Sequence, residues 1–540
     1  MSTINPLLEC DNPDRQLPVK DDGGKSMNGA EALVHSLVAC GVDTCFTNPG
    51  TSEIHIVAAL DGVPEMRCAL GLFEGVVTGA ADGYARMAEK PSCTLLHLGP
   101  GFANGLANLH NASRAQVPMV NIIGQHATYH LRHDTPLTSD IEAIARPYSK
   151  WLRTSCAASE IGADVADAIV AARTSPGQIT TLIVPADVAW SAGGSVVGSP
   201  ALSRAPVPAN ETIERAAVML RSGLRTGIIL SGAALYGEGL AAAGRVAAAA
   251  NAKLLSPYPF ARLERGAGIV PVERINYILE MAVAQLKEFQ QLILVDSAAP
   301  VAYFAYPGKS CVMTPPKCEI HTLSRSGEDS IAALEALSEA LTFRETRAFA
   351  ANAQRPPLPS GGITLPGLAS VVGALLPEHA IVVDESMTSG RGLMEATKGA
   401  PPHDWLGNTG GSIGIALPLA VGAAVACPER RVLCLTADGS AMYTVQALWT
   451  MARESLNVTT VVFANRGYNV LKREFSGLGI GIPSPRVLDL FEIGRPDINW
   501  VALAKSMGVP GMRVDSLDAF AKELRRGLET DGPKLIQVDV

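Results

Sequence analysis

The chain has 540 residues, of which 47% are hydrophobic and 18% are charged, and its formal net charge is −8. This length exceeds what one hydrophobic core usually organises, so about three domains are expected. The acidic balance and the lack of a long Lys/Arg cluster exclude nucleic acid and an anionic membrane surface as the main ligand. No stretch of about 20 continuously apolar residues predicts a membrane span. The ten cysteines are scattered without CxxC spacing, which is typical of reduced thiols in a cytoplasmic protein.

Residues 1–27 mix charges and prolines without a continuous apolar core, so they are predicted to form a flexible arm and not a secretory signal. The segment 29–41 has apolar residues at helical spacing and ends on a glycine, which predicts a helix. Short apolar runs typical of strands follow, separated by stretches long enough for helices, at 44–50, 93–101, 118–125 and 180–188. Residues 28–195 are therefore expected to form a first α/β unit.

A Pro/Ser/Ala-rich stretch at 196–210 indicates a linker, and the alternation of strand-like and helix-like segments resumes in residues 211–345. A second Pro-rich linker, at 346–365, precedes further strand candidates in residues 366–540. Because right-handed crossovers place helices on both faces of parallel strands, each unit should contain a mainly parallel sheet. The predicted fold class is α/β, with three consecutive doubly wound, mainly parallel-sheet domains.

Polar residues follow two strand candidates of the third unit. One strand is followed by Asp438, Gly439 and Ser440, and Asn465 follows the next strand, 27 residues after Asp438. Both positions lie where open α/β sheets bind ligands. Carboxylate, amide and carbonyl oxygens suit Mg²⁺ bridging two phosphates, and a hydroxyl near a helix start favours a diphosphate oxygen. Taken alone, an Asp-Gly pair at a strand end more often marks a simple turn.

Together with Gly467, Asp438 and Asn465 resemble the diphosphate–metal signature of thiamine diphosphate (ThDP) enzymes, a GDG followed by an Asn-rich turn. Ala437 and Ala464 replace the first Gly and the first Asn of that pattern, but neither position supplies a side-chain ligand in the family. The resemblance therefore implies Asp438, Asn465 and the carbonyl of Gly467 as metal ligands, with ThDP and Mg²⁺ as cofactors.

The first unit supplies the other half of the resemblance. Its segment LGLFEGVVTGAADGYAR (70–86) is similar to the family segment that carries the glutamate which activates the cofactor, here Glu74. Without the metal motif, this carboxylate would be interpreted only as a partner of a helix dipole. NPGTSEI, the GPG of 99–101, TGGSIGIALPLAVGAA and KLIQVDV also occur in the order found in acetolactate synthase, pyruvate oxidase and benzoylformate decarboxylase. Residues 28–195 should then bind the pyrimidine, and 366–540 the diphosphate and metal.

The resemblance implies further roles for individual residues. Ile413 would wedge between the cofactor rings, Gly411 would offer its carbonyl to the pyrimidine amine, and a hydroxyl at Thr388 would hold the diphosphate. The full set of implied cofactor-binding residues is Glu74, Thr388, Gly411, Ile413, Asp438, Gly439, Ser440, Asn465 and Tyr468. His97 aligns with a proton-transfer histidine of benzoylformate decarboxylase and Thr51 with its substrate-binding serine, so Glu74, His97 and Thr51 are the predicted catalytic residues. An isoleucine or histidine in such places can also be an ordinary core residue.

The implied function is a ThDP- and Mg²⁺-dependent, non-oxidative decarboxylase or carboligase that acts on a 2-oxo acid, similar to benzoylformate decarboxylase. That enzyme has a second catalytic histidine where 299–308 has none and Phe304 or Ala305 lies nearest, which leaves room for carboligation. The alternatives are an acetolactate synthase-like carboligase that forms a 2-hydroxy-2-methyl-3-oxo acid from pyruvate, and a catalytically silent ThDP-fold binding protein. FAD is not excluded, although the central unit has no flavin fingerprint. A homodimer or homotetramer with the cofactor at the chain interface is expected, and the pocket residues near Tyr468, Val470 and Leu471 limit the substrate's size only loosely.

Overall fold

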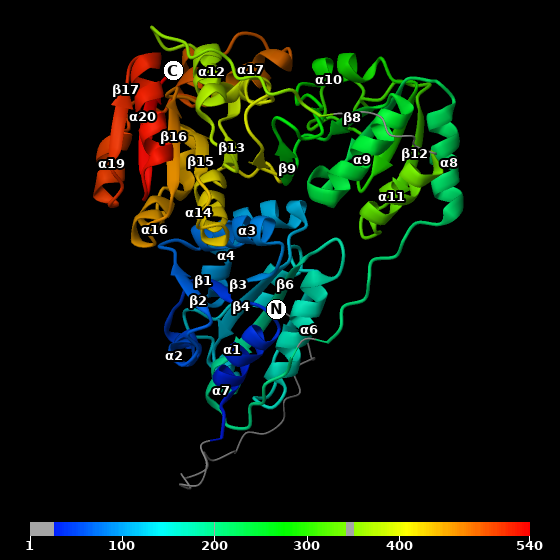
Figure 1. Cartoon of the computed structure of the whole chain (residues 1–540). Coiled ribbons are helices and arrows are strands. Elements are labelled where there is room, and N and C mark those ends of the chain that lie inside the picture. Colours follow the sequence, from blue (N-terminus) through cyan, green and yellow to red (C-terminus); the bar gives the residue numbers. More distant parts are fainter. Residues whose placement is uncertain (1–25, 199, 342–349) are drawn as a thin grey trace.

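The computed structural model describes residues 26–198, 200–341 and 350–540, so most of the predicted arm (1–27) lies outside the described residues. The described chain forms three α/β bodies, each built around its own sheet (Figure 1). In this view the N-terminal body lies below, while the central body (green) and the C-terminal body (yellow to red) lie above it. This arrangement confirms the predicted α/β class with three mainly parallel sheets.

The N-terminal sheet has six parallel strands in the order β2-β1-β3-β4-β6-β5. Strands β3, β4 and β6 are buried over their whole length, because helices cover both faces of the sheet. The strands are β1 (Thr44–Asn48), β2 (Arg67–Leu70), β3 (Ser92–Leu96), β4 (Met119–Gln125), β5 (Trp151–Thr154) and β6 (Ile179–Pro185). The α-helices are α1 (Gly29–Ala39), α2 (Ile54–Asp61), α3 (Glu74–Ala88), α4 (Leu98–Ala115), α5 (Ile141–Ala145), α6 (Ile161–Arg173) and α7 (Ala186–Trp190).

The central sheet has five parallel strands in the order β10-β8-β7-β11-β12. Its strands are β7 (Thr226–Leu230), β8 (Lys253–Ser256), β10 (Glu273–Arg274), β11 (Gln291–Val295) and β12 (Glu319–Ser324). Its α-helices are α8 (Asn210–Arg221), α9 (Gly237–Ala250), α10 (Leu279–Leu286) and α11 (Ser330–Ala340). Asp296 follows β11 in a left-handed conformation, with φ of 50°. Its carboxylate fills the space beside Gly232 after β7, where an added Cβ would lie 2.2 Å from Oδ2 of Asp296.

The C-terminal sheet has seven strands in the order β17-β18-β16-β15-β13-β14-β9. Its strands are β9 (Arg262–Arg265), β13 (Ile381–Glu385), β14 (His403–Gly407), β15 (Val432–Ala437), β16 (Val458–Ala464), β17 (Gly511–Val514) and β18 (Lys534–Asp539). Its α-helices are α12 (Leu365–Leu375), α13 (Leu393–Ala396), α14 (Ala416–Ala426), α15 (Asp438–Ala441), α16 (Ala447–Arg453), α17 (Asn469–Gly477), α18 (Pro485–Asp489), α19 (Trp500–Ser506) and α20 (Leu517–Glu529).

Strand β9 joins a different sheet from β8 and β10, its neighbours in the sequence. It lies within the range predicted for the central domain (211–345), yet it pairs antiparallel with β14 at the edge of the C-terminal sheet. Residues Arg262 and Arg265 of the central segment therefore belong structurally to the C-terminal body. The exact domain boundaries stay predictions, because a sheet marks the core of a domain and not its limits.

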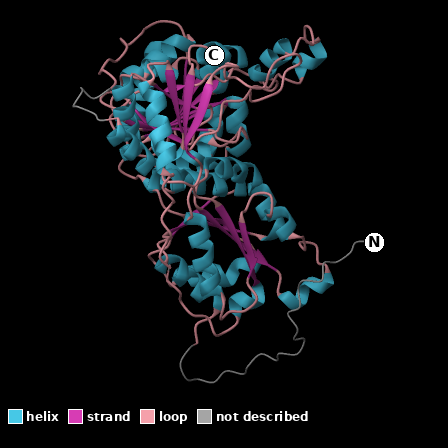
Figure 2. Cartoon of the chain, turned by 90° about the vertical axis from the view of Figure 1, so that its right-hand side faces the viewer, coloured by secondary structure: helices cyan, strands magenta, loops and turns pink. Residues whose placement is uncertain are grey.

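Helices α3 and α14 join the N-terminal and C-terminal bodies (Figure 1), and the turned view of Figure 2 shows helices packed between the two sheets. Their backbones approach closely because small residues face each other: a Cβ added to Gly422 would lie 1.9 Å from the carbonyl oxygen of Ala80, and one added to Gly83 would lie 2.1 Å from that of Leu419. Both helices are buried almost all round. Among the helices in the described ranges, none is long and apolar enough to cross a membrane.

Candidate cofactor site

A cavity of about 1520 Å³ lies between the central and C-terminal bodies. It is larger than a usual small-molecule pocket of roughly 300–1,000 Å³, so it has room for a cofactor and a substrate together. The sequence-predicted residues of the C-terminal body all line it: Thr388, Gly411, Ile413, Asp438, Gly439, Ser440, Asn465, Gly467 and Tyr468. Residues separated by up to 80 positions thus meet in one cavity, since parallel strands bring their carboxyl ends to the same edge of a sheet.

Asp438 lies at the start of α15, directly after β15, and is only 3% exposed. Its Oδ1 accepts the backbone N–H of Gly439 at 2.9 Å, and its Oδ2 accepts that of Arg466 at 2.7 Å. Burial raises the pKa of Asp438 above its usual value, while these N–H donors act in the opposite direction. A cation at this carboxylate would offset the cost of burying its charge. Gly439 leaves room for Tyr468, whose ring an added Cβ would approach to 2.7 Å.

Asn465 follows β16 and lies beside the same part of the cavity. Its Oδ1 accepts the backbone N–H of Gly467 at 3.0 Å, and the carbonyl of Gly467 accepts the N–H of Asn469 at 3.0 Å. Each of these oxygens has a second lone pair for a ligand. Across the described ranges, no three His, Cys, Asp or Glu side chains form a metal site. The donor set fits Mg²⁺, which in proteins is commonly held by one or two carboxylates plus phosphate oxygens.

The segment 408–416 forms the wall of the cavity that carries Gly411 and Ile413. Gly411 has φ of +78°, and an added Cβ would lie 2.1 Å from Oη of Tyr303, so this position requires glycine. Its N–H donates to Oδ1 of Asn408 at 2.8 Å. Within the described residues, no hydrogen bond goes to the carbonyl oxygen of Gly411, so that oxygen can accept a ligand's amine.

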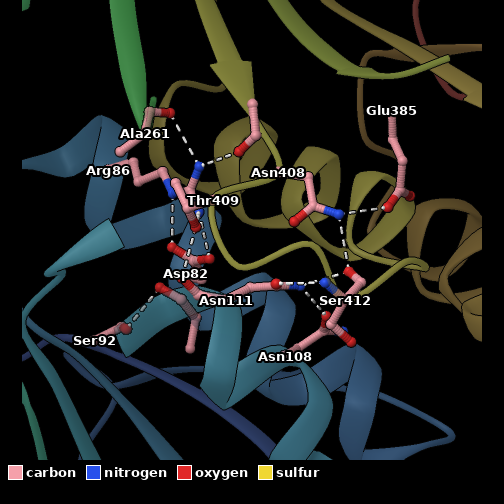
Figure 3. Close-up of polar contacts among 12 residues, drawn as sticks. Asp82, Arg86, Ser92, Asn108, Asn111, Ala261, Glu385, Asn408, Thr409 and Ser412 are labelled. Carbon is pink, nitrogen blue, oxygen red and sulfur yellow. Dashed lines mark hydrogen bonds and ion pairs between the residues drawn. The ribbon is translucent and has the colours of Figure 1, made fainter. Parts of the chain in front are cut away.

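Side chains of α4 hold this segment from the N-terminal body (Figure 3). Asn111 accepts the N–H of Ser412 at 3.2 Å and donates to its carbonyl at 2.8 Å, and the backbone carbonyl of Asn111 accepts the Thr409 hydroxyl at 2.6 Å. Nε2 of His110 lies 3.1 Å from the carbonyl oxygen of Gly410. These bonds fix residues 408–414, which connect β14 to α14 and belong to neither element.

Arg86 of α3 connects the N-terminal body to the edge of the C-terminal sheet, at the residue before β9 and at the end of β14 (Figure 3). Its guanidinium pairs with Asp82 one turn earlier at 2.7 Å, and both side chains are buried. It also donates to the carbonyl oxygens of Ala261 at 3.0 Å and Gly407 at 2.8 Å. Burial raises the pKa of Asp82, and the charge of Arg86 opposes that rise. Each of the two buried charges is paired and hydrogen-bonded. Arg86 can therefore hold the carbonyl of Gly407, which lies directly before the 408–416 segment.

Glu385 was not predicted from the sequence, although it lines the cavity. It ends β13, is 2% exposed, and accepts hydrogen bonds from the side chain of Asn408 and the backbone N–H groups of Gly414 and Ala416. Burial raises the pKa of Glu385 to about 7 despite these donors. A charged residue at the end of an apolar strand run, AIVVDES, was the available signal.

Glu74 begins α3 and is 9% exposed. Its Oε2 accepts the side-chain amide of Asn104 at 3.0 Å. A Cβ added to Gly101 would lie 3.2 Å from Oε1 of Glu74 and 3.3 Å from Cβ of His97, so the two side chains flank this glycine of the GPG motif. The structure thus brings two of the predicted catalytic residues together on the N-terminal body.

His97 is oriented by a residue that the sequence analysis did not select. Nδ1 of His97 lies 2.8 Å from Oε2 of Glu53, whose side chain is fully buried, and 3.1 Å from the hydroxyl of Ser52. Glu53 also accepts the Ser52 hydroxyl at 2.6 Å and the N–H of Gly50 at 2.8 Å. Thr51 lies in the same turn, η1 (Thr51–Glu53), and is exposed. The polar residues of NPGTSEI carried this signal, but only Thr51 was selected.

The predicted catalytic residues of the N-terminal body and the cavity lie in different parts of the chain. None of the three predicted catalytic residues, Glu74, His97 and Thr51, is among the described residues that line the cavity. The segment without the second histidine (299–308) instead supplies aromatic side chains: Tyr303 and Phe304 line the cavity, and the Tyr306 hydroxyl donates to Glu474 of α17 at 2.7 Å. Val470 and Leu471 line the cavity as expected.

Comparison with known proteins places this architecture in a family. The chain matches the models for the N-terminal TPP binding domain of thiamine pyrophosphate enzymes over residues 27–144 and for their C-terminal TPP binding domain over residues 390–538. IlvX of Mycobacterium tuberculosis is 52% identical over 515 residues, which are 95% of this chain and 99% of that protein. The chain therefore belongs to the thiamine diphosphate-dependent enzymes.

Its relatives fall into the acetolactate synthase and benzoylformate decarboxylase group. IlvX is named provisionally as an acetolactate synthase large subunit. Benzoylformate decarboxylase of Pseudomonas aeruginosa is 28% identical over 524 residues, 92% of this chain and 96% of that one. The solved ThDP-dependent 4-hydroxybenzoylformate decarboxylase of Rhodococcus jostii RHA1 has the same fold, with a TM-score of 0.83 at 23% identity over 95% of this chain and 99% of that chain. The predicted family and the prediction of an enzyme are confirmed.

Proposed function

We propose that this enzyme uses ThDP with Mg²⁺ to break or form the carbon–carbon bond beside the carbonyl of a 2-oxo acid, without net oxidation. One observation carries the proposal: a single cavity combines the oxygen donors of Asp438 and Asn465 with the tightly held Gly411 and Ile413. Hard oxygen donors suit a metal–diphosphate group, while a rigid apolar side chain suits a ring system. These two requirements meet in ThDP.

When bound, ThDP supplies the nucleophile and electron sink that the reaction needs. The chain's own residues hold and orient it. Asp438 and Asn465, with the carbonyl of Gly467, would hold Mg²⁺, while Thr388 and Ser440 offer hydroxyls to the diphosphate. The carbonyl of Gly411 would accept the pyrimidine amine, and the Ile413 side chain would hold the cofactor in a bent form. The wall that carries these last two groups is fixed by hydrogen bonds to Asn408, Asn111 and Glu385.

His97 is proposed to move a proton at the substrate carbon. Its Nδ1 faces the buried carboxylate of Glu53, so the ring is held in one orientation and Nε2 is left for the substrate. A histidine positioned by a carboxylate is a common general acid–base arrangement. Glu74, with its Oε2 held by Asn104, is proposed to exchange a proton with the pyrimidine ring of the cofactor.

Glu74 and the cavity lie on different parts of the chain, so we propose that a second copy of the chain completes the site. A homodimer with two-fold symmetry would place Glu74 of each copy against the Asp438 cavity of the other. The separation of Glu74 from the cavity lining supports this arrangement.

The net reaction has two candidate forms. Decarboxylation would convert R–CO–COOH into R–CHO and CO₂, with the proton of the new C–H bond delivered by an acid such as His97. Carboligation would join two pyruvate molecules into 2-hydroxy-2-methyl-3-oxobutanoate and release one CO₂. Two observations favour carboligation as the second candidate: the 52% identity to IlvX, and aromatic residues where a second histidine would be needed.

The test combines cofactor binding with a substrate panel. ThDP titrated with and without Mg²⁺ should produce a Mg²⁺-dependent near-UV circular dichroism change. The loaded enzyme should then release CO₂ from aryl or aliphatic 2-oxo acids, and NMR of the products separates aldehyde from 2-hydroxy ketone. A yellow preparation with a flavin spectrum would identify FAD as an additional cofactor. Binding of ThDP without CO₂ release from any 2-oxo acid would refute the proposed reaction.

A further inference from the structure

One buried carboxylate of the C-terminal body, that of Glu385, holds the segment 408–416. Glu385 accepts the N–H of Gly414 on both oxygens, at 3.1 and 3.2 Å, and the N–H of Ala416 at 3.2 Å. It also accepts the side-chain amide of Asn408 at 3.1 Å. Asn408 and Ala416 are the first and last residues of the segment, and Gly414 directly follows Ile413. The carboxylate therefore contacts both ends of the segment that carries Gly411 and Ile413.

Asn408 extends this contact to the cavity wall itself. Its amide nitrogen donates to Glu385 and to the carbonyl of Ser412 at 2.9 Å, and its Oδ1 accepts the N–H of Gly411. Figure 3 shows the side chains of Glu385 and Asn408 pointing toward each other above Ser412. The amide of Asn408 thus relays the position of Glu385 to Gly411, which lines the cavity.

We propose that Glu385, acting through Asn408, is a positioning residue that holds the Gly411–Ile413 wall in the geometry that binds and bends the cofactor. This inference rests on the proposed cofactor contacts of Gly411 and Ile413. Glu385 is not a catalytic residue in this proposal, because its oxygens are occupied by the protein's own N–H groups.

The donor pattern specifies which chemical form of the side chain is needed. Every group that the structure places within hydrogen-bond distance of Glu385 is a donor, and an ionised carboxylate is an acceptor only. A glutamine has nearly the same shape, but its NH₂ group would face N–H donors on one side. Glu385→Gln is therefore expected to disrupt the segment while filling the same space.

A compensating change can restore part of the pattern. In Glu385→Gln/Asn408→Asp, the amide of Gln can donate to the new carboxylate, while its oxygen still accepts from Gly414 and Ala416. The Asp oxygen can still accept the N–H of Gly411. The Asp oxygen that replaces the amide nitrogen of Asn408 would instead face the carbonyl of Ser412, another acceptor, 2.9 Å away, while that carbonyl keeps its bond from Asn111. The double variant should therefore recover only part of what Glu385→Gln loses.

The first readout uses the protein without cofactor at about pH 8.5, above the pKa of about 7 to which burial raises Glu385, so that this carboxylate is ionised. Amide hydrogen exchange of peptides that cover 408–416 should become about 10- to 100-fold faster in Glu385→Gln, which corresponds to loss of a hydrogen bond to a charged group. The matched control is Asp296→Asn, which neutralises another partly buried carboxylate with a raised pKa at a strand end, in the central body away from this segment. Exchange in 408–416 should not change in that control.

The second readout is titration with ThDP and Mg²⁺, followed by near-UV circular dichroism. Glu385→Gln should raise the ThDP concentration at half-saturation by about 10-fold or more. The double variant should return exchange and affinity toward wild type. If Glu385→Gln does not fold, Asn408→Ala, which removes only the relay, should give the same faster exchange around Gly411.

Wild-type exchange in 408–416 together with wild-type ThDP affinity in Glu385→Gln, or in Asn408→Ala where the first variant does not fold, would overturn the proposal. Both readouts measure the wall and the cofactor and not the substrate. A wild-type protein that binds ThDP but decarboxylates no 2-oxo acid would therefore refute the proposed reaction and leave this inference standing.

Discussion

Oε2 of Glu53 lies 2.8 Å from Nδ1 of His97, and the carboxylate that makes this contact is completely shielded from solvent. The space for the pair is provided by two glycines. A Cβ added to Gly124 would lie 1.7 Å from Oε1 of Glu53, and one added to Gly50 would lie 2.3 Å from the His97 ring. Neither side chain can shift far, so the orientation of the imidazole depends on Glu53.

Glu53→Gln should therefore lower turnover of a 2-oxo acid by roughly 10²-fold, the scale of a general acid–base contribution. The amide can still hydrogen-bond the ring, but it cannot balance a positive charge there. Ser52→Ala is the control, because it removes a hydroxyl that contacts both Nδ1 of His97 and Oε1 of Glu53 and keeps the carboxylate. Steady-state rates at saturating ThDP test this expectation, and equal rates in the two variants would contradict it.

Glu74→Gln should separate cofactor binding from cofactor activation. The amide fills the same space and can remain beside Asn104, but it cannot exchange a proton. ThDP and Mg²⁺ should bind with modest loss, while hydrogen–deuterium exchange at the thiazolium C2 of bound ThDP slows by roughly 10²-fold or more. This exchange is measured by NMR without any substrate. Wild-type exchange in Glu74→Gln would remove this residue from the proposed chemistry.

Asp438→Ala and Asn465→Ala should each abolish the Mg²⁺-dependent part of ThDP binding while the chain stays folded. The reason is that the metal needs their oxygens, whereas the fold places them at the cavity and not in the hydrophobic core. Isothermal titration with ThDP, with and without Mg²⁺, measures the effect, and far-UV circular dichroism checks the fold. Unchanged affinity in either variant would show that another group holds the metal.

Mixing two inactive variants tests the two-chain site. A dimer of one Glu74→Gln chain and one Asp438→Ala chain has one site with both wild-type residues if the site spans two chains. Random exchange should then restore about a quarter of wild-type activity, since half of the dimers are mixed and each has one intact site. If Glu74 and Asp438 of the same chain form the site, no activity should return.

Asp296→Asn should stabilise the protein at alkaline pH. Burial raises the pKa of Asp296 from 3.8 to about 6, and its Oδ1 has no hydrogen-bond partner in the described structure. Because the folded state binds the proton more tightly than the unfolded state, the cost of the buried charge is absent below pH 3.8. It grows as the pH rises and reaches about 3 kcal/mol above pH 6, from 1.36 kcal/mol per pKa unit.

The stability gain of Asp296→Asn should therefore be largest near pH 8 and vanish near pH 4. Asparagine also tolerates the left-handed backbone at this position. Urea unfolding of both proteins at the two pH values measures the difference. A gain of equal size at both pH values would indicate a cause other than the buried charge.

The sequence by itself determined the α/β class, the family and the cofactor-binding candidates of the C-terminal body, all of which line the cavity. Strand periodicity shows where a strand ends, and parallel topology brings such ends together, so Asp438 and Asn465 could be placed in one site from their spacing. Glu74 was found only through the resemblance, since a single Glu at a helix start has a common structural explanation.

Tertiary structure alone decided which groups hold these residues in place. The bond from Arg86 to Gly407 spans 321 positions, and that from Asn111 to Ser412 spans 301, so no local pattern could indicate either. Strand β9 joins a sheet outside its own segment because its partner, β14, is formed far along the chain. Glu53 and Glu385 look like surface carboxylates in sequence. In the structure both carboxylates are buried against N–H donors, and Glu53 also contacts a histidine. Only the packed fold determines such burial.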